Sequence, residues 1–92
     1  MEFEWDETKA TANLKKHCVS FEEATTVFDN PLALIFEDEA HSIGEQREII
    51  IGHSRQNRLL LVCFTERPNA IRIISARLAT PREREDYEQN AF

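Results

Sequence analysis

The stretch that decides the fold is RLLLVCFTERPNAIRIISARL, residues 58–78. It holds two runs rich in β-branched and other apolar residues, 58–65 and 70–78, and such runs are typical of β-strands. The turn residues Arg67-Pro68-Asn69 lie between them. Because strands joined by so short a connection usually pair with each other, the stretch predicts an antiparallel hairpin.

Two further strands are expected on the amino-terminal side of this hairpin. Residues 45–55 centre on three consecutive isoleucines, and residues 32–36 form a shorter apolar run. Gln56-Asn57 suits a tight turn after the isoleucine strand, because Asn tolerates positive φ. Residues 37–44 form a polar loop. The pattern therefore predicts a four-stranded antiparallel β-meander.

Two helices are expected before the meander. Asp6 can cap a helix that runs to about His17. Ser20 opens a shorter helix, and Glu23 stands three residues further on, as a capping box requires. Asn30-Pro31 ends this second helix.

A third helix is expected after the meander, where Thr80-Pro81-Arg82-Glu83 forms a complete start signal. Its apolar residues are few, Tyr87 and Ala91, so it is either solvated or completed by a partner. The predicted fold class is α+β, with two amino-terminal helices, the meander and a carboxy-terminal helix, the helices packing on one face of the sheet.

Composition limits the class of protein. The 92 residues are 41% apolar and 30% charged, which predicts a single folded domain over residues 1–92. No apolar run is long enough to cross a membrane, and the acidic amino terminus is no secretory signal. Two cysteines without a disulfide framework indicate a cytoplasmic protein. The His and Cys residues lack metal-ligand spacing, so neither a metal site nor a cofactor is expected.

Charge is distributed unevenly along the chain. Residues 1–46 hold three lysines against eleven carboxylates, and residues 47–92 hold eight arginines against six carboxylates, which gives the net charge of −6. Such asymmetry indicates an anionic partner for one surface of an otherwise acidic protein.

Strand alternation decides whether these arginines gather on one surface. In an uninterrupted strand 70–78, one face would carry Ile71, Ile73, Ser75 and Arg77, and the other Arg72, Ile74, Ala76 and Leu78. Arginines lie mostly towards the strand ends, so we expect them to ring a concave surface that binds phosphate bidentately. The alternative is that they are solvated or paired with the acidic helices.

Several segments together resemble a known family. They are FEWDETKATANLKKH (3–17), VSFEEA (19–24), VFDNPLAL (27–34), D-AHS-GE-R (38–47), RLLLV-FTER (58–67) and IRIISAR-AT--ER--YE (71–88). They resemble the BrnT family, the ribonuclease toxins of bacterial type II toxin–antitoxin pairs. Two positions depart from that pattern: Cys18 follows Lys-His where Gly is usual, and Asn57 occupies a hairpin position that usually carries Gly.

The resemblance implies a fold similar to that of the RelE ribonucleases and a toxin that cleaves RNA and inhibits translation. It further implies neutralisation by a small DNA-binding antitoxin, BrnA-like, that is encoded beside the toxin. Operator DNA would then be contacted only through the antitoxin, in a two-plus-two hetero-tetramer. No membrane is implied.

Candidate site residues follow from the chemistry of RNA cleavage without a metal, which needs a base, charge stabilisation at the phosphate and an acid. Arg67 and Arg77 are the leading candidates for charge stabilisation, and Arg47, Arg72 and Lys16 are further phosphate-binding candidates. The selected candidates for acid or base are Glu66, His41 and Tyr87, and His17, His53 and Lys16 are weighed beside them; the sequence identifies no single general base. Each has a structural alternative: a salt bridge for the arginines, a solvated position for Lys16, and helix docking for Tyr87.

Two other functions remain open. One is an interaction module that binds the antitoxin and tunes operon repression without efficient catalysis, which the acidic net charge and Cys18 favour. The other is a free-standing single-strand RNA binder that uses Phe64 or Tyr87 as stacking platforms.

Overall fold

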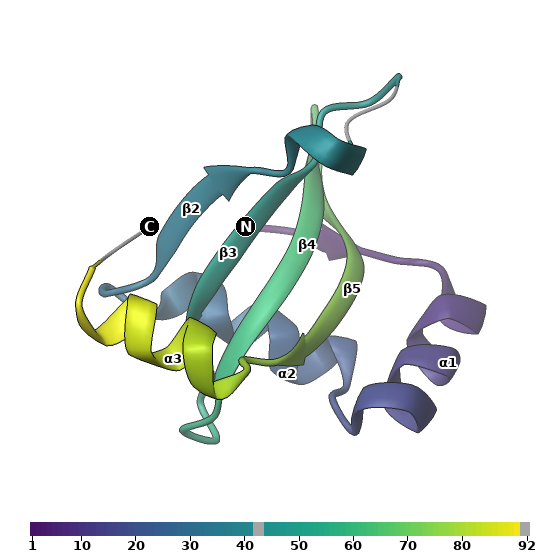
Figure 1. The fold of residues 1–92 in the computed structure, drawn as a ribbon. Helices are drawn as coiled ribbons and strands as arrows, with labels where there is room; N and C mark the ends of the chain where they lie inside the picture. The colour runs from purple at the N-terminus through teal and green to yellow at the C-terminus, as the bar shows by residue number, and fades with distance from the viewer. Residues whose placement is uncertain (42–43, 91–92) are drawn as a thin grey trace.

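The computed structural model describes residues 1–41 and 44–90, without the side chain of His41. Within them the order of elements is β1 (Phe3–Glu4), α1 (Glu7–His17), α2 (Phe21–Thr26), η1 (Val27–Asp29), β2 (Leu34–Glu37), η2 (Glu39–His41), β3 (Glu48–His53), β4 (Leu59–Arg67), β5 (Ala70–Leu78) and α3 (Pro81–Glu88). The prediction of an α+β protein is confirmed (Figure 1).

The described strands form one mixed five-stranded sheet in the order β1-β5-β4-β3-β2. Strands β2 to β5 make the expected antiparallel meander, but the prediction of four strands is wrong because β1 pairs with β5 in parallel. A strand of two residues carries no periodic signal in the sequence. It is fixed by tertiary contacts: the Phe3 ring lies 5.2 Å from that of Phe28, and Glu2 O accepts from Ile71 N at 2.8 Å.

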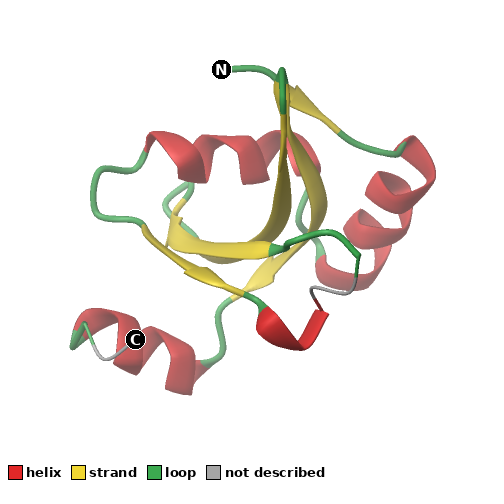
Figure 2. Ribbon diagram, turned by 90° about the horizontal axis from the view of Figure 1, so that it is seen from above, coloured by secondary structure: helices red, strands yellow, loops and turns green. Residues whose placement is uncertain are grey.

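The helices do not share one face of the sheet, so that prediction is wrong. Helix α2 and η1 lie across one face, α1 flanks β5, and α3 lies against the opposite face near one end of the strands (Figures 1 and 2). The polar sequence of α3 explains this position, because the helix has no buried residue and needs little of the core. Among the described residues, no helix is long and apolar enough to span a membrane.

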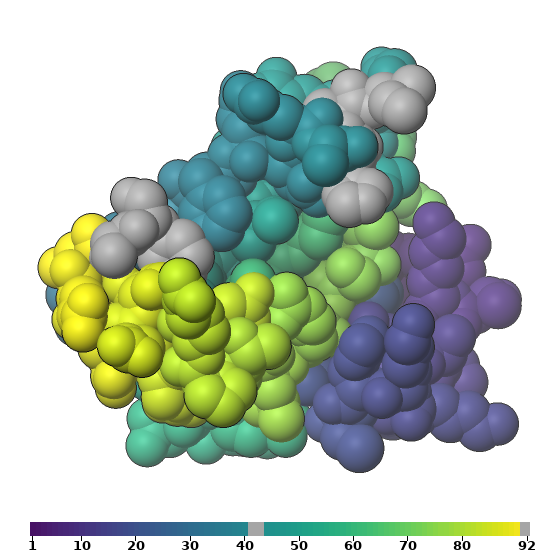
Figure 3. All heavy atoms as spheres, viewed as in Figure 1, coloured from purple at the N-terminus to yellow at the C-terminus, as the bar shows by residue number. Residues whose placement is uncertain are grey.

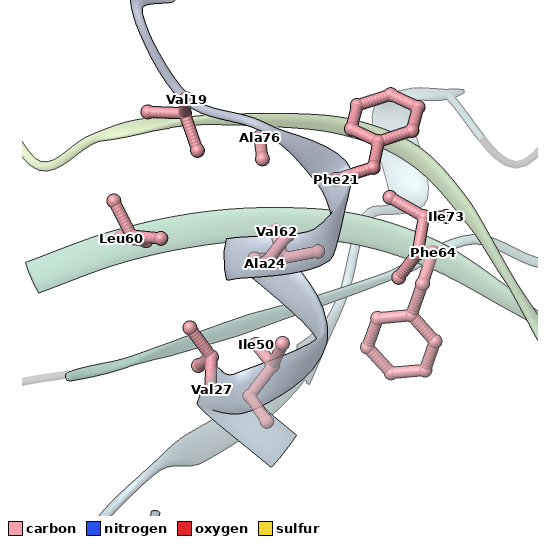
Figure 4. Packing of buried hydrophobic residues seen from close by; sticks show 10 residues of the cluster. All are labelled: Val19, Phe21, Ala24, Val27, Ile50, Leu60, Val62, Phe64, Ile73 and Ala76. Atoms are coloured by element: carbon pink, nitrogen blue, oxygen red, sulfur yellow. The ribbon is translucent and has the colours of Figure 1, made fainter. Parts of the chain in front are cut away.

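The main core lies between α2 and the sheet (Figure 4). We call this side of the sheet the core face. Its buried residues are Val19, Phe21, Ala24, Val27, Ile50, Leu60, Val62, Phe64, Ile73 and Ala76. The opposite side, which we call the open face, has a smaller buried cluster of Ile51, Leu59 and Leu61 beneath α3. Burial on both sides explains why the strands read as nearly continuous apolar runs.

A β-bulge in β5 changes the alternation predicted for this strand. Cys63 pairs with Ser75, but the next residue, Phe64, pairs with Ile73. Ile74 is therefore the extra residue, and alternation shifts by one position after it. The predicted grouping of Ile71 and Ile73 with Ser75 and Arg77 is wrong, since Ile73 and Ala76 both lie in the main core.

Local start signals agree well with the structure. Asp6 and Thr80 cap α1 and α3, and Thr80 with Glu83 completes the predicted capping box. Ser20 caps α2, but the Glu23 carboxylate, assigned to the other half of a box there, accepts instead from Ser54 and Arg58. Strands β2 and β3 start later than predicted: β2 begins at Leu34 instead of residue 32, and β3 begins at Glu48 instead of residue 45.

Asn13 is a buried polar residue that the sequence did not single out. Its side-chain amide donates to Ala76 O at 2.8 Å and its oxygen accepts from Ala76 N at 3.1 Å. These backbone groups face the edge of β5 beyond the two residues that β1 covers. The Asn13 side chain thus replaces a neighbouring strand and ties α1 to the sheet.

Candidate phosphate-binding site

The open face carries a hollow of about 370 Å³ lined by Asp38, Arg47, Ile49, Leu61, Cys63, Ile74, Ser75 and Arg77. In Figure 3 the central strands are visible between α3, in yellow, and α1, in purple and blue. Cross-strand pairing builds the floor: Ile49, Cys63 and Ser75 form one row, and Ile51, Leu61 and Arg77 form the next. The hollow therefore combines an apolar floor with two guanidinium groups.

Arg77 is held by the first turn of α3. Its Nη1 and Nη2 donate to the two carboxylate oxygens of Glu83 at 2.7 and 2.9 Å. Glu83 Oε1 also accepts from the backbone N–H of Thr80. The hydrogen bond from Arg77 is the main cause that lowers the pKa of Glu83 to about 2, and the same pair raises the pKa of Arg77 above its ordinary value. Both groups are charged at neutral pH.

Arg47 and Asp38 line the hollow from the segments on either side of η2, and Arg47 O accepts from Asp38 N at 2.9 Å. This backbone bond brings an acidic and a basic side chain to the same wall. Neighbouring Cys63 is a thiol at neutral pH, because burial and the Asp38 charge raise its pKa while Arg47 lowers it less. A thiolate nucleophile is therefore not favoured here.

Arg67 and Arg72 lie on the open face beyond the hollow. Arg72 pairs across the strands with Thr65, two residues from Cys63 on the same face. Its guanidinium donates to Glu4 Oε2 at 2.8 Å, and Arg67 forms a salt bridge with Glu45 at 3.1 Å. The predicted salt bridges thus exist: Arg67, Arg72 and Arg77 pair with carboxylates of the β2–β3 connection, β1 and α3. Arg58, away from the hollow, pairs with Glu23 of α2, as the alternative of pairing with the acidic helices predicted.

Glu66 is not brought together with the hollow. It follows Phe64 by two residues, so it lies on the core-face side of β4, away from Cys63 and Arg77. Glu48 lies on the same side, and burial, then the charge of Glu66, raises its pKa. Glu66 therefore joins an acidic group on the opposite side of the sheet from the arginines of the hollow.

Tyr87 docks α3. Its hydroxyl donates to Leu32 O at 2.8 Å, and its ring meets that of His53 edge-on at 5.9 Å. Tyr87 is not among the residues lining the hollow. Lys16 is exposed on α1, which flanks β5. The side chain of His41 lies outside the described residues.

The structure places four residues in or beside the hollow that the sequence analysis did not select: Asp38, Cys63, Ser75 and Glu83. Asp38 lies in the same polar segment as His41, so the sequence pattern that made His41 a candidate applied equally to Asp38. Glu83 was assigned only to the helix cap. Ser75 and Cys63 lie side by side because β5 and β4 pair in this register, which the sequence does not show. Phe64, a suggested stacking platform, is 2% exposed and cannot stack on a base.

Across residues 1–41 and 44–90, no group of three or more His, Cys, Asp or Glu residues could hold a metal ion.

Comparison with known proteins gives the family. The family model for the ribonuclease toxin BrnT of type II toxin–antitoxin systems matches residues 5–83. The chain belongs to the BrnT family. A solved BrnT toxin is also similar: the 1.1 Å crystal structure of the Brucella abortus ribonuclease toxin, with a TM-score of 0.67 and 25% sequence identity, covering 87% of this chain and 97% of that one. No curated protein sequence matches this chain significantly.

The motifs that resemble BrnT proteins now have separate physical roles. In the amino-terminal block, Asp6 caps α1 and Asn13 holds the edge of β5, so that block builds the scaffold. In the carboxy-terminal block, Arg77 and Glu83 form the ion pair beside the hollow. The further likeness to RelE ribonucleases stays a prediction.

Proposed function

We propose that this BrnT-family chain is a single-domain endoribonuclease toxin that cleaves RNA without a metal ion and thereby inhibits translation. The observation that supports this most is the hollow on the open face, with Arg47 and Arg77 beside an apolar floor. Guanidinium groups bind phosphate in a planar, bidentate manner, and they remain charged at every physiological pH.

The reaction assigned to the hollow is attack of a ribose 2′-hydroxyl on the adjacent phosphorus, with departure of the 5′-oxygen. Arg77 and Arg47 stabilise the additional negative charge on the phosphate in the transition state. Arg67 and Arg72, further along the open face, hold neighbouring phosphates of the strand. The partly buried floor excludes some water, which strengthens these interactions.

Asp38 is the base that we favour, because its carboxylate lines the hollow beside Arg47. His41, three residues later, is the candidate for the acid that protonates the leaving oxygen. Glu66 and Tyr87 are less suited to either step, since Glu66 lies on the core-face side of β4 and the Tyr87 hydroxyl donates to Leu32 O.

The partner that we propose is a DNA-binding, BrnA-like antitoxin that neutralises the toxin in the cytoplasm. The amino-terminal half, with eleven carboxylates, provides an acidic surface for basic antitoxin segments. Because a DNA-binding antitoxin is commonly a symmetric dimer, the complex would contain two copies of each chain. Copurification after co-expression with the neighbouring gene product tests this; separate elution of the two proteins would count against it.

A second candidate function is an interaction module with weak catalysis. Three candidate arginines form ion pairs with carboxylates: Arg67 with Glu45, Arg72 with Glu4, and Arg77 with Glu83. This partial neutralisation reduces the attraction for RNA and favours a role in antitoxin binding and operon repression.

Two cleavage assays separate the two functions: a labelled single-stranded RNA alone in EDTA, and messenger RNA on translating ribosomes in a magnesium-containing buffer. We expect wild-type protein to cleave, Arg77→Ala and Arg67→Ala to lose activity, and Arg55→Ala to retain it. Arg55 is the matched control because it is 79% exposed on the β3–β4 hairpin, away from the hollow. Tight antitoxin binding without cleavage in either assay would support the interaction module instead.

A further inference from the structure

Glu83 belongs to two local structures at once. As the third residue of α3, it closes the capping box by accepting from Thr80 N at 2.9 Å. The same carboxylate receives two hydrogen bonds from Arg77 on the preceding strand. A helix start and a strand end are therefore joined through a single side chain, of which 23% is exposed.

The ion pair with Glu83 uses the Nη1 and Nη2 end of the Arg77 guanidinium. It leaves free the edge that is formed by Nε–H and the other Nη2 hydrogen. Nη1 contacts Glu83 Oε1 and Leu78 O, while Nη2 contacts Glu83 Oε2. Among the described residues, neither the Nε–H nor the second Nη2 hydrogen of Arg77 has a partner. These two donors form the edge with which arginine makes its second kind of bidentate contact. In this protein, Arg58 uses that edge, Nε and Nη2, to bind Glu23.

We propose that Glu83 is a positioning residue for RNA cleavage: it fixes the Arg77 guanidinium so that the Nε/Nη2 edge receives the scissile phosphate. The inference rests on the proposed ribonuclease function. A long arginine side chain that is already ordered loses little freedom when the phosphate gains charge in the transition state. The carboxylate also partly neutralises Arg77, so Glu83 weakens binding of the RNA ground state while it supports turnover.

This double effect gives a kinetic signature. Glu83→Gln retains an acceptor for the Thr80 N–H but loses the charge and one acceptor for Arg77. We expect kcat to fall about tenfold or more, whereas KM is unchanged or lower, as for an interaction that acts in the transition state. Glu83→Asp, which retains the charge with a shorter side chain, should recover part of the lost kcat.

Two controls separate positioning from a loss of helix stability. Thr80→Ala removes the other half of the capping box without touching the ion pair, and should leave kcat near the wild-type value. Glu85→Gln makes the same charge change at an exposed position of α3 and should behave as wild type. Thermal unfolding of each variant records whether the fold is retained.

A double-mutant cycle provides the decisive measurement. If Glu83 acts through Arg77, Glu83→Gln should add no loss of kcat to Arg77→Ala or Arg77→Lys. An added loss of the same size in the double variant would overturn the proposal. So would full activity of Glu83→Gln beside an inactive Arg77→Ala, which leaves the ribonuclease function standing. Inactive wild-type protein on both free and ribosome-bound RNA would remove the proposed function and this inference with it.

Discussion

Arg72 and Arg77 lie on the same face of the sheet although their positions differ by five, an odd number. An odd spacing in a regular strand places two side chains on opposite faces. The bulge at Ile74 removes this difference, because Arg72 pairs with Thr65 and Arg77 pairs with Leu61 on the open face of β4. One extra residue thus brings two arginines onto the same surface, and bulges near functional sites often redirect side chains in this way.

The first prediction concerns the number of RNA phosphates that this surface neutralises. Each arginine in contact with a phosphate should contribute about 0.7 to the slope of log affinity against log salt for a single strand. We expect Arg77→Ala and Arg47→Ala each to reduce the slope by about that amount in a fluorescence titration with single-stranded RNA. Arg55→Ala serves as the control, and an equal reduction there would indicate contacts unrelated to the open face.

The second prediction concerns the Glu23–Arg58 ion pair, which links α2 to the β3–β4 hairpin. Glu23 is 5% exposed, and its carboxylate accepts from Arg58 and from Ser54 at 2.7 Å. Removing one partner of such a pair leaves a buried charge, so Arg58→Ala should lower the free energy of unfolding by about 3 kcal/mol. Arg55→Ala, at the exposed tip of the same hairpin, should change it by less than about 0.5 kcal/mol.

Urea unfolding titrations give these free energies, and repeating them at several pH values measures the pH dependence of the pair. The hydrogen bond from Arg58 lowers the pKa of Glu23 below its ordinary value of 4.5. A lowered folded-state pKa stabilises the protein above the unfolded pKa, and the stabilisation is lost as pH falls through the folded pKa. The deficit of Arg58→Ala should therefore shrink below about pH 4.5; a deficit that grows on acidification would contradict the assignment.

The third prediction concerns Cys18, which ends α1 in the left-handed conformation with φ of 58°. Residues with a Cβ are strained there, and Gly is the usual choice. Cys18→Gly should raise the stability by roughly 1 kcal/mol, since the Cys18 carbonyl that accepts from Arg58 is retained. Cys18→Ala tests the cause: it also removes the thiol, so equal stabilisation by Ala would rule out relief of backbone strain.

The fourth prediction concerns Glu48. Burial, then the charges of Glu66 and Glu37, raise the pKa of its carboxyl group in the folded protein. A raised folded-state pKa destabilises the protein above that pKa, and the penalty disappears as the carboxyl group becomes protonated. Glu48→Gln should therefore raise the melting temperature at pH 7 and have little effect below about pH 4. Glu22→Gln, at an exposed position of α2, should show no such gain.

Ion pairing reduces the positive charge that the arginines bring to the open face. Glu4, Glu45 and Glu83 come from separate parts of the chain, and each contacts a different arginine of the open face or its rim. The net charge of −6 therefore does not describe the local potential. The arginines keep their charge, but the carboxylates offset part of it; if the proposed RNA binding holds, this favours defined contacts over non-specific binding.

The sequence by itself determined the elements that depend on local chemistry. Neighbouring residues are enough to predict the helix caps at Asp6 and Thr80 and the turn at Asn57, where φ is 61°. They are also enough to predict the strands around Ile49–Ile51 and Leu59–Phe64. Each needs only interactions within a few positions, so it leaves a readable pattern.

Tertiary structure alone decided what depends on partners far along the chain. Strand β1 forms because it pairs with β5 and because the Phe3 ring packs against Phe28. Asn13 is structurally important because its side chain binds the backbone of Ala76, which has no neighbouring strand on that edge of β5. The candidate site belongs to this second group. The extra residue in β5 moves Ser75 and Arg77 to the open face, whereas Glu66 stays on the other side of β4. A side-chain period of two makes a one-residue shift reverse the face, and such a shift is fixed by pairing rather than by local sequence.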